Sequence, residues 1–331
     1  MYKNIALTGL LVYVLSAPTS LHAAEAQDCS LKRYASIDLE ESPNGHLLVP
    51  VTIEETRALM LLDTDTIYST LTEAAVDRLA LQTHSSSVAT KTLTGETYIP
   101  KIATAKELSI GSAKFKTREF YVPLTSNISI IAARDYSNAQ VVGIIGMDVL
   151  ANVDVELDVA SRKMNLYSQD HCPNHVVYWS KVYDSVPIHL YTRGSAFYFP
   201  IELDGKKIEA TLSTWQSTTT LSTDVTKKLY NFDSHSPDVE SETDTAGKTM
   251  AHYRAMELDA VGFKVVNAHI TLIDPRIGNC HLGTRFGAAA YDCEGSPPLR
   301  LGLNVLTKLH IYLATKEKVL YFTPAEATDQ R

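Results

Sequence analysis

Basic clusters and membrane-length apolar runs are both missing from this sequence of 331 residues. Its 38 acidic side chains outnumber its 30 basic ones, which gives a formal net charge of −8. Binding to a phosphate backbone needs clustered Lys and Arg, so the acidic balance predicts no nucleic acid partner. Hydrophobic residues make up 45% of the chain and charged residues 21%. These fractions are typical of a globular protein and exclude a polytopic membrane protein, a coiled coil and a disordered chain.

An apolar run near the N-terminus covers only residues 5–15, whereas a bilayer-spanning helix needs roughly 20 residues. Lys3 precedes the run, and small residues follow it as far as Ala26. This arrangement is typical of a secretory signal peptide, and a retained anchor is the alternative. We therefore expect residues 1–23 to be removed, with no stable membrane insertion afterwards. The mature protein is then expected to be exported, in the periplasm or outside the cell.

Cysteine is scarce, and its spacing gives no sign of a metal site. The four residues, which all follow the expected signal peptide, are Cys29, Cys172, Cys280 and Cys293. The sequence has no Cys-x2-Cys pair and no HExxH motif, so we expect no metal ion and no other cofactor. Four cysteines allow three disulfide pairings. We favour Cys29 with Cys172, which ties the mature N-terminus to the end of the first half, and Cys280 with Cys293.

What the sequence does contain is an internal repeat. Residues Ala58–Leu79 align without a gap on Ile208–Leu229, and Ile145–Leu157 align on Leu301–Leu313. Similarity of a chain to itself at a nearly fixed offset indicates two copies of one structural unit.

The repeat divides the mature chain into two units of similar length. The first unit runs from about Ser36 to Tyr167, and the second from about Pro187 to Phe322. As domains, we expect a first lobe at 24–171, a linker at 172–186 and a second lobe at 187–331. The length of the chain also favours two domains, because a typical domain has roughly 150 residues.

Strand patterns dominate both units. Short runs rich in β-branched and aromatic residues are separated by turn signals such as Asp204-Gly205. Thr72 is a plausible N-cap for one of the few predicted helices. The predicted helical segments are 72–80 and 147–151 in the first unit, and 222–230 and 303–308 in the second. Few helices and many strands predict an all-β protein of two similar lobes.

Two motifs in the first unit resemble a known family. Leu61-Leu62-Asp63-Thr64 precedes a short predicted helix, and Val142–Leu150 (VGIIGMDVL) precedes an apolar strand. They are similar to motifs of the retropepsin-like aspartic peptidases, in the bacterial exported form with two fused lobes. The resemblance implies two tandem acid-protease lobes related by a pseudo-two-fold axis, and thus a monomer with an internal pseudo-dimer. It also implies a hairpin flap over the cleft in each unit, at 93–99 and at 243–253.

Aspartic peptidases need one carboxyl group from each lobe. Two carboxyls about 3 Å apart share one proton, so one can deprotonate the attacking water while the other protonates the carbonyl oxygen. The resemblance makes Asp63 a candidate catalytic residue, with Thr64 beside it. In the second unit the alignment places Ser213 and Thr214 at these positions. A serine hydroxyl donates or accepts hydrogen bonds but does not share a proton as a carboxylate does.

Three further positions depart from the family pattern. The third loop residue should be glycine, for a tight loop and a close backbone approach, but the sequence has Asp65 in the first unit and Trp215 in the second. Arg300 stands where the first unit has the apolar Ile144. Together with Ser213, we interpret these changes as four independent losses at one site.

These departures favour one functional hypothesis over two others. We expect a degenerate homologue that lacks the dyad and binds an extended peptide or unfolded protein segment between its lobes. The alternative is an active aspartic endopeptidase in which Asp63 uses another carboxyl, either Asp65 or Asp63 of a second molecule. A structural envelope protein is the third hypothesis, because fold does not determine function. Asp63 and Thr64 could also form a simple turn after a buried strand.

Overall fold

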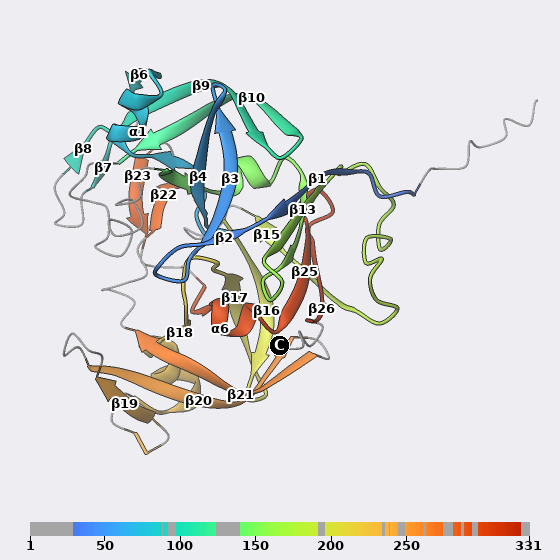
Figure 1. Cartoon of the computed structure of the whole chain (residues 1–331). Helices are drawn as coiled ribbons and strands as arrows, with labels where there is room; N and C mark the ends of the chain where they lie inside the picture. The colour runs from blue at the N-terminus through green and yellow to red at the C-terminus, as the bar shows by residue number, and fades with distance from the viewer. Residues whose placement is uncertain are drawn as a thin grey trace, which may run out of the picture.

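The computed structural model of the chain is built mainly of strands (Figure 1). It describes residues 29–87, 89–91, 97–123, 140–190, 196–233, 236–237, 239–243, 249–260, 263–273, 281–285, 288–292 and 297–325. The expected signal peptide, residues 1–23, lies outside them. Within the described residues, strands form two eight-stranded sheets, one six-stranded sheet and two short hairpins. The predicted all-β fold is confirmed.

The eight-stranded sheet of the first unit has the order β2-β3-β4-β11-β5-β10-β9-β6. Its strands are β2 (Glu40–Glu41), β3 (Leu47–Ile53), β4 (Thr56–Leu62), β5 (Thr70–Leu71), β6 (Gln82–Ser85), β9 (Lys101–Ile110), β10 (Ala113–Val122) and β11 (Val141–Ile145). β11 pairs parallel with β4 and antiparallel with β5, so it lies between them. Along β3, Val49, Val51 and Ile53 are buried in the core, as the two-residue period of a strand predicts.

The eight-stranded sheet of the second unit has the equivalent order, β15-β16-β17-β24-β18-β21-β20-β19. Its strands are β15 (His189–Leu190), β16 (Phe197–Leu203), β17 (Lys206–Leu212), β18 (Thr219–Ser222), β19 (Val239–Thr243), β20 (Thr249–Ala260), β21 (Phe263–Ile273) and β24 (Leu299–Leu301). β24 pairs parallel with β17 and antiparallel with β18, as β11 does with β4 and β5. The two sheets therefore match strand by strand.

The hairpin turns of the two sheets also match. Glu54 and Glu55 join β3 to β4 with φ of 46° and 67°, and Asp204 and Gly205 join β16 to β17 with φ of 47° and 72°. Positive φ at both central residues is characteristic of a type I′ turn, which fits the twist of antiparallel strands. Asp-Gly is a common sequence for this turn and Glu-Glu is not, so the sequence signals only the second turn.

A six-stranded sheet contains strands from both units, in the order β1-β13-β12-β25-β26-β14. These strands are β1 (Arg33–Asp38), β12 (Asp154–Asp158), β13 (Lys163–Tyr167), β14 (Asp184–Pro187), β25 (Leu309–Ala314) and β26 (Val319–Pro324). β12 of the first unit pairs with β25 of the second, which joins the units at the centre of the sheet. β14 begins within the segment predicted as a linker, 172–186. The domain boundaries and the two-fold axis stay predictions.

Short helices follow the strands near the predicted positions. They are α1 (Glu73–Arg78), α3 (Met147–Leu150), α4 (Thr223–Val225), the π-helix η2 (Thr226–Tyr230) and α6 (Leu303–Leu306). The hydroxyl of Thr72 accepts a hydrogen bond from the backbone N–H of Ala75, so Thr72 is the N-cap of α1 as expected. Within the described residues, no helix is both long enough and apolar enough to cross a membrane.

Two small hairpins lie beside the large sheets. They are formed by β7 (Thr90–Lys91) with β8 (Thr97–Tyr98), and by β22 (His281–Arg285) with β23 (Ala288–Asp292). β23 belongs to the second unit but contacts β7 of the first (Figure 1). The tips of the two predicted flaps, residues 92–96 and 244–248, lie outside the described residues.

One disulfide links the N-terminal end of the described chain to the segment after β13. Cys29 is bonded to Cys172, at a sequence separation of 143 residues, which confirms the first predicted pair. Cys280 and Cys293 lie outside the described residues, so their pairing stays a prediction. The hairpin between them pairs His281 with Asp292, the residues next to the two cysteines.

Candidate functional site

The candidate catalytic loops lie at equivalent ends of two strands. Asp63 follows β4, and its backbone N–H donates to the carbonyl of Ile145 at 3.1 Å. Ser213 follows β17, and its N–H donates to the carbonyl of Leu301 at 2.9 Å. Each loop is therefore hydrogen-bonded to the strand, β11 or β24, that pairs parallel with the strand preceding the loop. The structure places Ser213 at the position equivalent to Asp63, as the sequence alignment predicts.

Thr64 and Thr214 join the two loops through reciprocal hydrogen bonds. The Thr64 hydroxyl donates to the carbonyl of Leu212 at 2.9 Å, and the Thr214 hydroxyl donates to the carbonyl of Leu62 at 2.7 Å. The backbone N–H of Thr64 also donates to the Thr214 hydroxyl at 3.1 Å. All these groups are buried. The exchange brings both loops to one place and excludes the interpretation of Asp63-Thr64 as an isolated turn.

Equivalent side-chain hydrogen bonds connect each loop region to the short helix that follows β11 or β24. The Ser69 hydroxyl donates to the Asp148 carboxylate at 2.6 Å and accepts from the N–H of Gly146 at 2.9 Å. In the second unit, Thr219 donates to the side-chain oxygen of Asn304 and accepts from the N–H of Gly302. A Cβ atom on Gly302 would approach the backbone of the second loop to 2.5 Å, so glycine is required there for close packing.

Asp63 is a buried carboxyl that exposes 7% of its surface. Its Oδ1 accepts a hydrogen bond from the backbone N–H of Asp65 at 3.0 Å. Burial and then the negative charge of Asp65 raise the pKa of Asp63 to about 7, against the opposing effects of the Asp65 N–H and of Arg300. Asp63 can therefore hold or release a proton near neutral pH. At the equivalent position, Ser213 is 2% exposed and contributes a hydroxyl.

Asp65 and Arg300 form a buried ion pair between the two units. Nη1 of Arg300 lies 2.8 Å from Oδ2 of Asp65, and each side chain is 1% exposed. Arg300 lies on β24, opposite Thr211 and Thr220, and Ile144 lies on β11, opposite Leu61 and Thr70. Arg300 and Ile144 thus occupy equivalent positions, as expected. The interpretation of Asp65 and Arg300 as independent losses is wrong, because each compensates the buried charge of the other.

Trp215, the other residue in place of a loop glycine, packs against the first unit. Its ring stacks on that of His46, with centroids 4.4 Å apart and planes at 7°. It also contacts a small apolar cluster on β3, β4 and β11, whose buried members are Leu48, Leu59, Leu61 and Val141. Neither Asp65 nor Trp215 has a positive φ, so both loops form without the conformational freedom of glycine.

Sequence reasoning missed His46, which has no motif around it that points to Trp215. It also missed two histidine and carboxylate pairs whose carboxylates lie on β12 of the six-stranded sheet. His171 lies 2.5 Å from Asp154, and His310 lies 2.9 Å from Glu156. The first pair packs the residue just before the predicted linker against β12, far along the chain from the Asp63 loop. Burial raises the pKa of Asp154, against the hydrogen bond and charge of His171. Within the described residues, no three metal-ligating side chains gather as a metal site.

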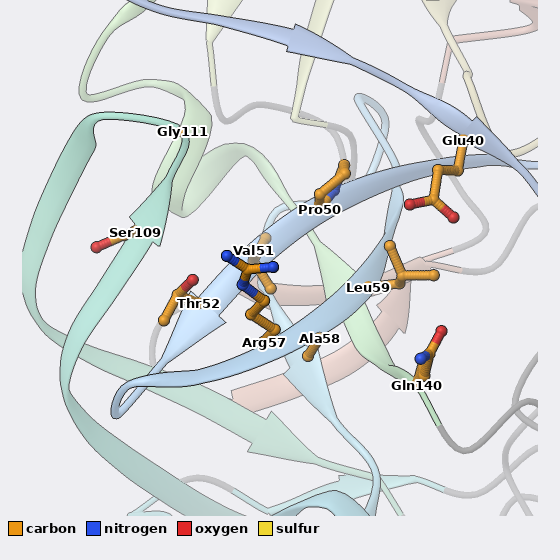
Figure 2. Close-up of a pocket in the computed structure, with 10 residues that line it drawn as sticks. All are labelled: Glu40, Pro50, Val51, Thr52, Arg57, Ala58, Leu59, Ser109, Gly111 and Gln140. Atoms are coloured by element: carbon orange, nitrogen blue, oxygen red, sulfur yellow. The ribbon is translucent and has the colours of Figure 1, made fainter.

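A cavity of about 400 Å³ lies on the β3–β4 hairpin (Figure 2). Its lining residues are Glu40, Pro50, Val51, Thr52, Arg57, Ala58, Leu59, Ser109, Gly111 and Gln140. The Asp63 loop does not line it. Leu59 lines the cavity and also belongs to the apolar cluster under Trp215, so the two features adjoin along β4.

One family model of known proteins matches part of the chain. The aspartyl protease family model matches residues 49–149. No curated protein is similar enough to be matched. Conglutin gamma, a basic 7S globulin from lupine seeds, has a similar solved structure, with a TM-score of 0.49 and 11% sequence identity over 89% of this chain and 95% of that one.

The matched segment runs from β3 to α3 and includes Asp63, Thr64 and β11. We call β11, which runs beside the Asp63 loop, and its counterpart β24 the threading strands. It contains both motifs that carry the resemblance in the sequence. Residues 49–149 therefore match the aspartyl protease family that these motifs resemble, within a chain of all-β, acid-protease-like fold.

Proposed function

We propose that this protein is an exported aspartyl protease homologue that binds an extended peptide or unfolded protein segment between its two units without cleaving it. The observation that carries the proposal is the buried pair of Asp65 with Arg300, beside a serine at the second dyad position. Of the two loop carboxyls, Asp65 forms the ion pair with Arg300, and Asp63 is the one that remains for proton transfer. Export is supported by the Cys29–Cys172 disulfide, since such bonds persist in oxidising compartments.

The chemistry of the site supports binding over hydrolysis. A two-carboxyl mechanism needs one group that accepts a proton from water and another that donates a proton to the carbonyl oxygen. Asp63, with a pKa raised to about 7 by burial and by Asp65, can fill one of these roles at a time. Ser213 cannot fill the other, because its hydroxyl does not ionise near neutral pH. Loss of one such role typically lowers a rate by about 10²- to 10⁴-fold.

The alternative function is an aspartic endopeptidase in which Asp65 completes the dyad. Asp65 is near enough to Asp63 to raise its pKa. However, the Oδ2 atom of Asp65 accepts a hydrogen bond from the guanidinium of Arg300 at 2.8 Å, and this ion pair engages the carboxyl that would have to share a proton with Asp63. A dyad from Asp63 of a second molecule is opposed by the Thr64 and Thr214 contacts, because the second unit already occupies the partner position.

Binding can be tested with a fluorescein-labelled protein that has been reduced and carboxymethylated so that it stays unfolded. Fluorescence anisotropy should rise on addition of the protein between about pH 4 and pH 7, while mass spectrometry finds the labelled chain intact. The variant Ile144→Glu places a charge on the threading strand beside Asp63 and should weaken binding. The matched control Val182→Glu changes a side chain that is 81% exposed and should bind as the wild type does. Equal binding by both variants would contradict binding between the units.

A further inference from the structure

The first unit has an apolar patch on the face of its sheet that points away from the main core. Along β4, Met60 and Leu62 are buried in the main core, whereas Leu59 and Leu61 belong to a separate cluster. Successive side chains of a strand point to opposite faces, so this separation is what the strand geometry requires. Leu48 and Val141 complete the buried part of the cluster, and Ile144 packs at its edge. We call these five residues the β4 patch: Leu48, Leu59, Leu61, Val141 and Ile144.

The β4 patch adjoins the loop that carries Asp63. Leu61 is two residues before Asp63 on the same strand, and Ile144 pairs with Leu61 on the neighbouring strand β11. An extended peptide that passes over Asp63 therefore has the patch beside it. The patch also shares Leu59 with the 400 Å³ cavity on the β3–β4 hairpin, so the two features adjoin along the strand.

A side chain of the second unit, Trp215, covers the β4 patch. Trp215 packs against it and stacks on His46, whose ring is 4.4 Å away. The patch thus holds an indole ring, which shows that its size and chemistry suit a large aromatic or apolar side chain. Trp215 itself is only partly buried, so part of its side chain is exposed to solvent.

The equivalent crossing on the other side of the site is of a different kind. There, Asp65 of the first unit pairs with Arg300 of the second, and both side chains are buried. Breaking that pair would leave charges without compensation in the interior, whereas Trp215 can leave the patch without exposing a buried charge. Separation of Asp65 from Arg300 therefore costs more than separation of Trp215 from the patch.

We infer that Trp215 is a displaceable plug, and that the β4 patch beneath it binds a large apolar side chain of an extended peptide in competition with Trp215. This inference rests on the proposed function for its ligand, and it adds the specificity of the site. A peptide binds only while the ring is displaced, so its apparent affinity falls with the fraction of molecules in which the patch is open. Removal of the ring opens the patch permanently.

The test uses the full mature protein and two short fluorescein-labelled peptides of Ala, Ser and Lys. One peptide has a central Phe, and the other has Ala at that position. Trp215→Gly should bind the Phe peptide about tenfold or more tightly than the wild type does, with no such gain for the Ala peptide. Trp215→Leu keeps an apolar side chain without the ring, so its affinity for the Phe peptide should lie between those of the wild type and Trp215→Gly. It replaces Trp215→Gly in the test if the glycine variant is unstable.

The chain offers its own control, because its two tryptophans are Trp215 and Trp179. Trp179 also stacks on a histidine, His310, at 4.0 Å, but it lies at the six-stranded sheet. In Trp179→Phe, Trp215 is the sole tryptophan, and its emission should shift to the red when the Phe peptide binds. Equal affinities of the wild type and Trp215→Gly for the Phe peptide, with unchanged Trp215 emission, would overturn the plug while leaving the proposed function intact.

Indole separates failure of the plug from failure of the proposed function. Free indole should raise the melting temperature of Trp215→Gly and leave that of the wild type unchanged, because a ligand that binds the folded state stabilises it. If neither peptide binds any variant but indole stabilises Trp215→Gly alone, the patch stands as an aromatic side-chain site and the proposed function falls. If indole has no effect on Trp215→Gly, the inference about the patch is wrong.

Discussion

Asp65, in the loop after β4 of the first unit, and Arg300, on β24 of the second, meet at 2.8 Å in the interior beside Asp63. With both side chains ionised, this pair and an ionised Asp63 carry a net charge of one negative unit. A dyad that shares one proton carries the same charge. When Asp63 is ionised, above its pKa of about 7, the site therefore has the charge of such a dyad without the shared proton.

The first prediction concerns the stability of this pair. Asp65→Asn or Arg300→Met alone should each destabilise the protein by about 3 to 5 kcal/mol, because each leaves a buried charge without its partner. The double variant should lose much less than the sum of the two. Urea unfolding of the wild type, both single variants and the double variant gives the coupling energy.

An exposed ion pair in the same protein is the control for this cycle. Lys163 lies 2.5 Å from Asp38, with 53% and 86% of the two side chains exposed. Lys163→Met should change stability by no more than about 1 kcal/mol. Additive effects of Asp65→Asn and Arg300→Met would show that the buried pair contributes no coupling.

The second prediction is that a peptidase dyad cannot be restored at the two loops alone. The triple variant Asp65→Gly, Ser213→Asp, Trp215→Gly provides the loop residues of the family pattern. It leaves the Arg300 guanidinium next to the new dyad, where it would hold a carboxyl ionised and prevent the sharing of a proton. Cleavage of an unfolded protein should appear only when Arg300→Ile is added. Activity of the triple variant would show that Arg300 does not control the dyad.

The third prediction is a pH dependence caused by Asp63. Burial and the charge of Asp65 raise its pKa to about 7, whereas an unfolded Asp has a pKa of about 3.9. The folded chain therefore holds this proton more tightly. The contribution of Asp63 to stability is complete below about pH 4 and is lost as the pH rises toward 7.

Asp63→Asn removes this dependence because an amide does not ionise. Relative to the wild type, the variant should gain as much as about 4 kcal/mol between pH 4 and pH 8, at about 1.36 kcal/mol per pKa unit. Urea unfolding of both proteins across this range measures the difference. Parallel stability curves would mean that the pKa of Asp63 is not raised in the folded protein.

The fourth prediction concerns the disulfides. The Cys29–Cys172 bond closes a loop with a sequence separation of 143 residues, and in the chain-entropy model it stabilises the fold by roughly 5 kcal/mol at most. The variant Cys29→Ala, Cys172→Ala should lose part of that energy. Mass spectrometry of the non-reduced, digested protein should find this pair and also Cys280 joined to Cys293. Four free thiols in protein from the exported compartment would contradict both bonds.

The local pattern of the sequence predicts much of the fold. Thr72 caps α1 because Ser and Thr side chains bond helix N-termini, and this depends only on neighbouring residues. The alignment of Asp63 with Ser213 is correct because both follow a buried strand that pairs with a threading strand. The buried strand and the strand that pairs parallel with it recur in both units, so the sequence shows this arrangement twice.

Long-range contacts between side chains could not be predicted in the same way. Trp215 stacks on His46 and His310 pairs with Glu156, and in each case the two residues lie far apart in the chain with no shared motif. The pair of Asp65 with Arg300 is an intermediate case. Each residue departs from the family pattern at its own position in the sequence, and only the packing of the two units shows that the two changes compensate.

The central claim is that Asp63 has no partner for two-carboxyl catalysis, and cleavage of an unfolded protein mixture tests it most directly. Wild type and Asp63→Ala are each incubated with the mixture between about pH 3 and pH 7, with and without an inhibitor that mimics the tetrahedral intermediate. We predict that mass spectrometry finds the same negligible cleavage for both proteins, with no effect of the inhibitor. Cleavage by the wild type that Asp63→Ala and the inhibitor both abolish would contradict the account and identify the protein as an active endopeptidase.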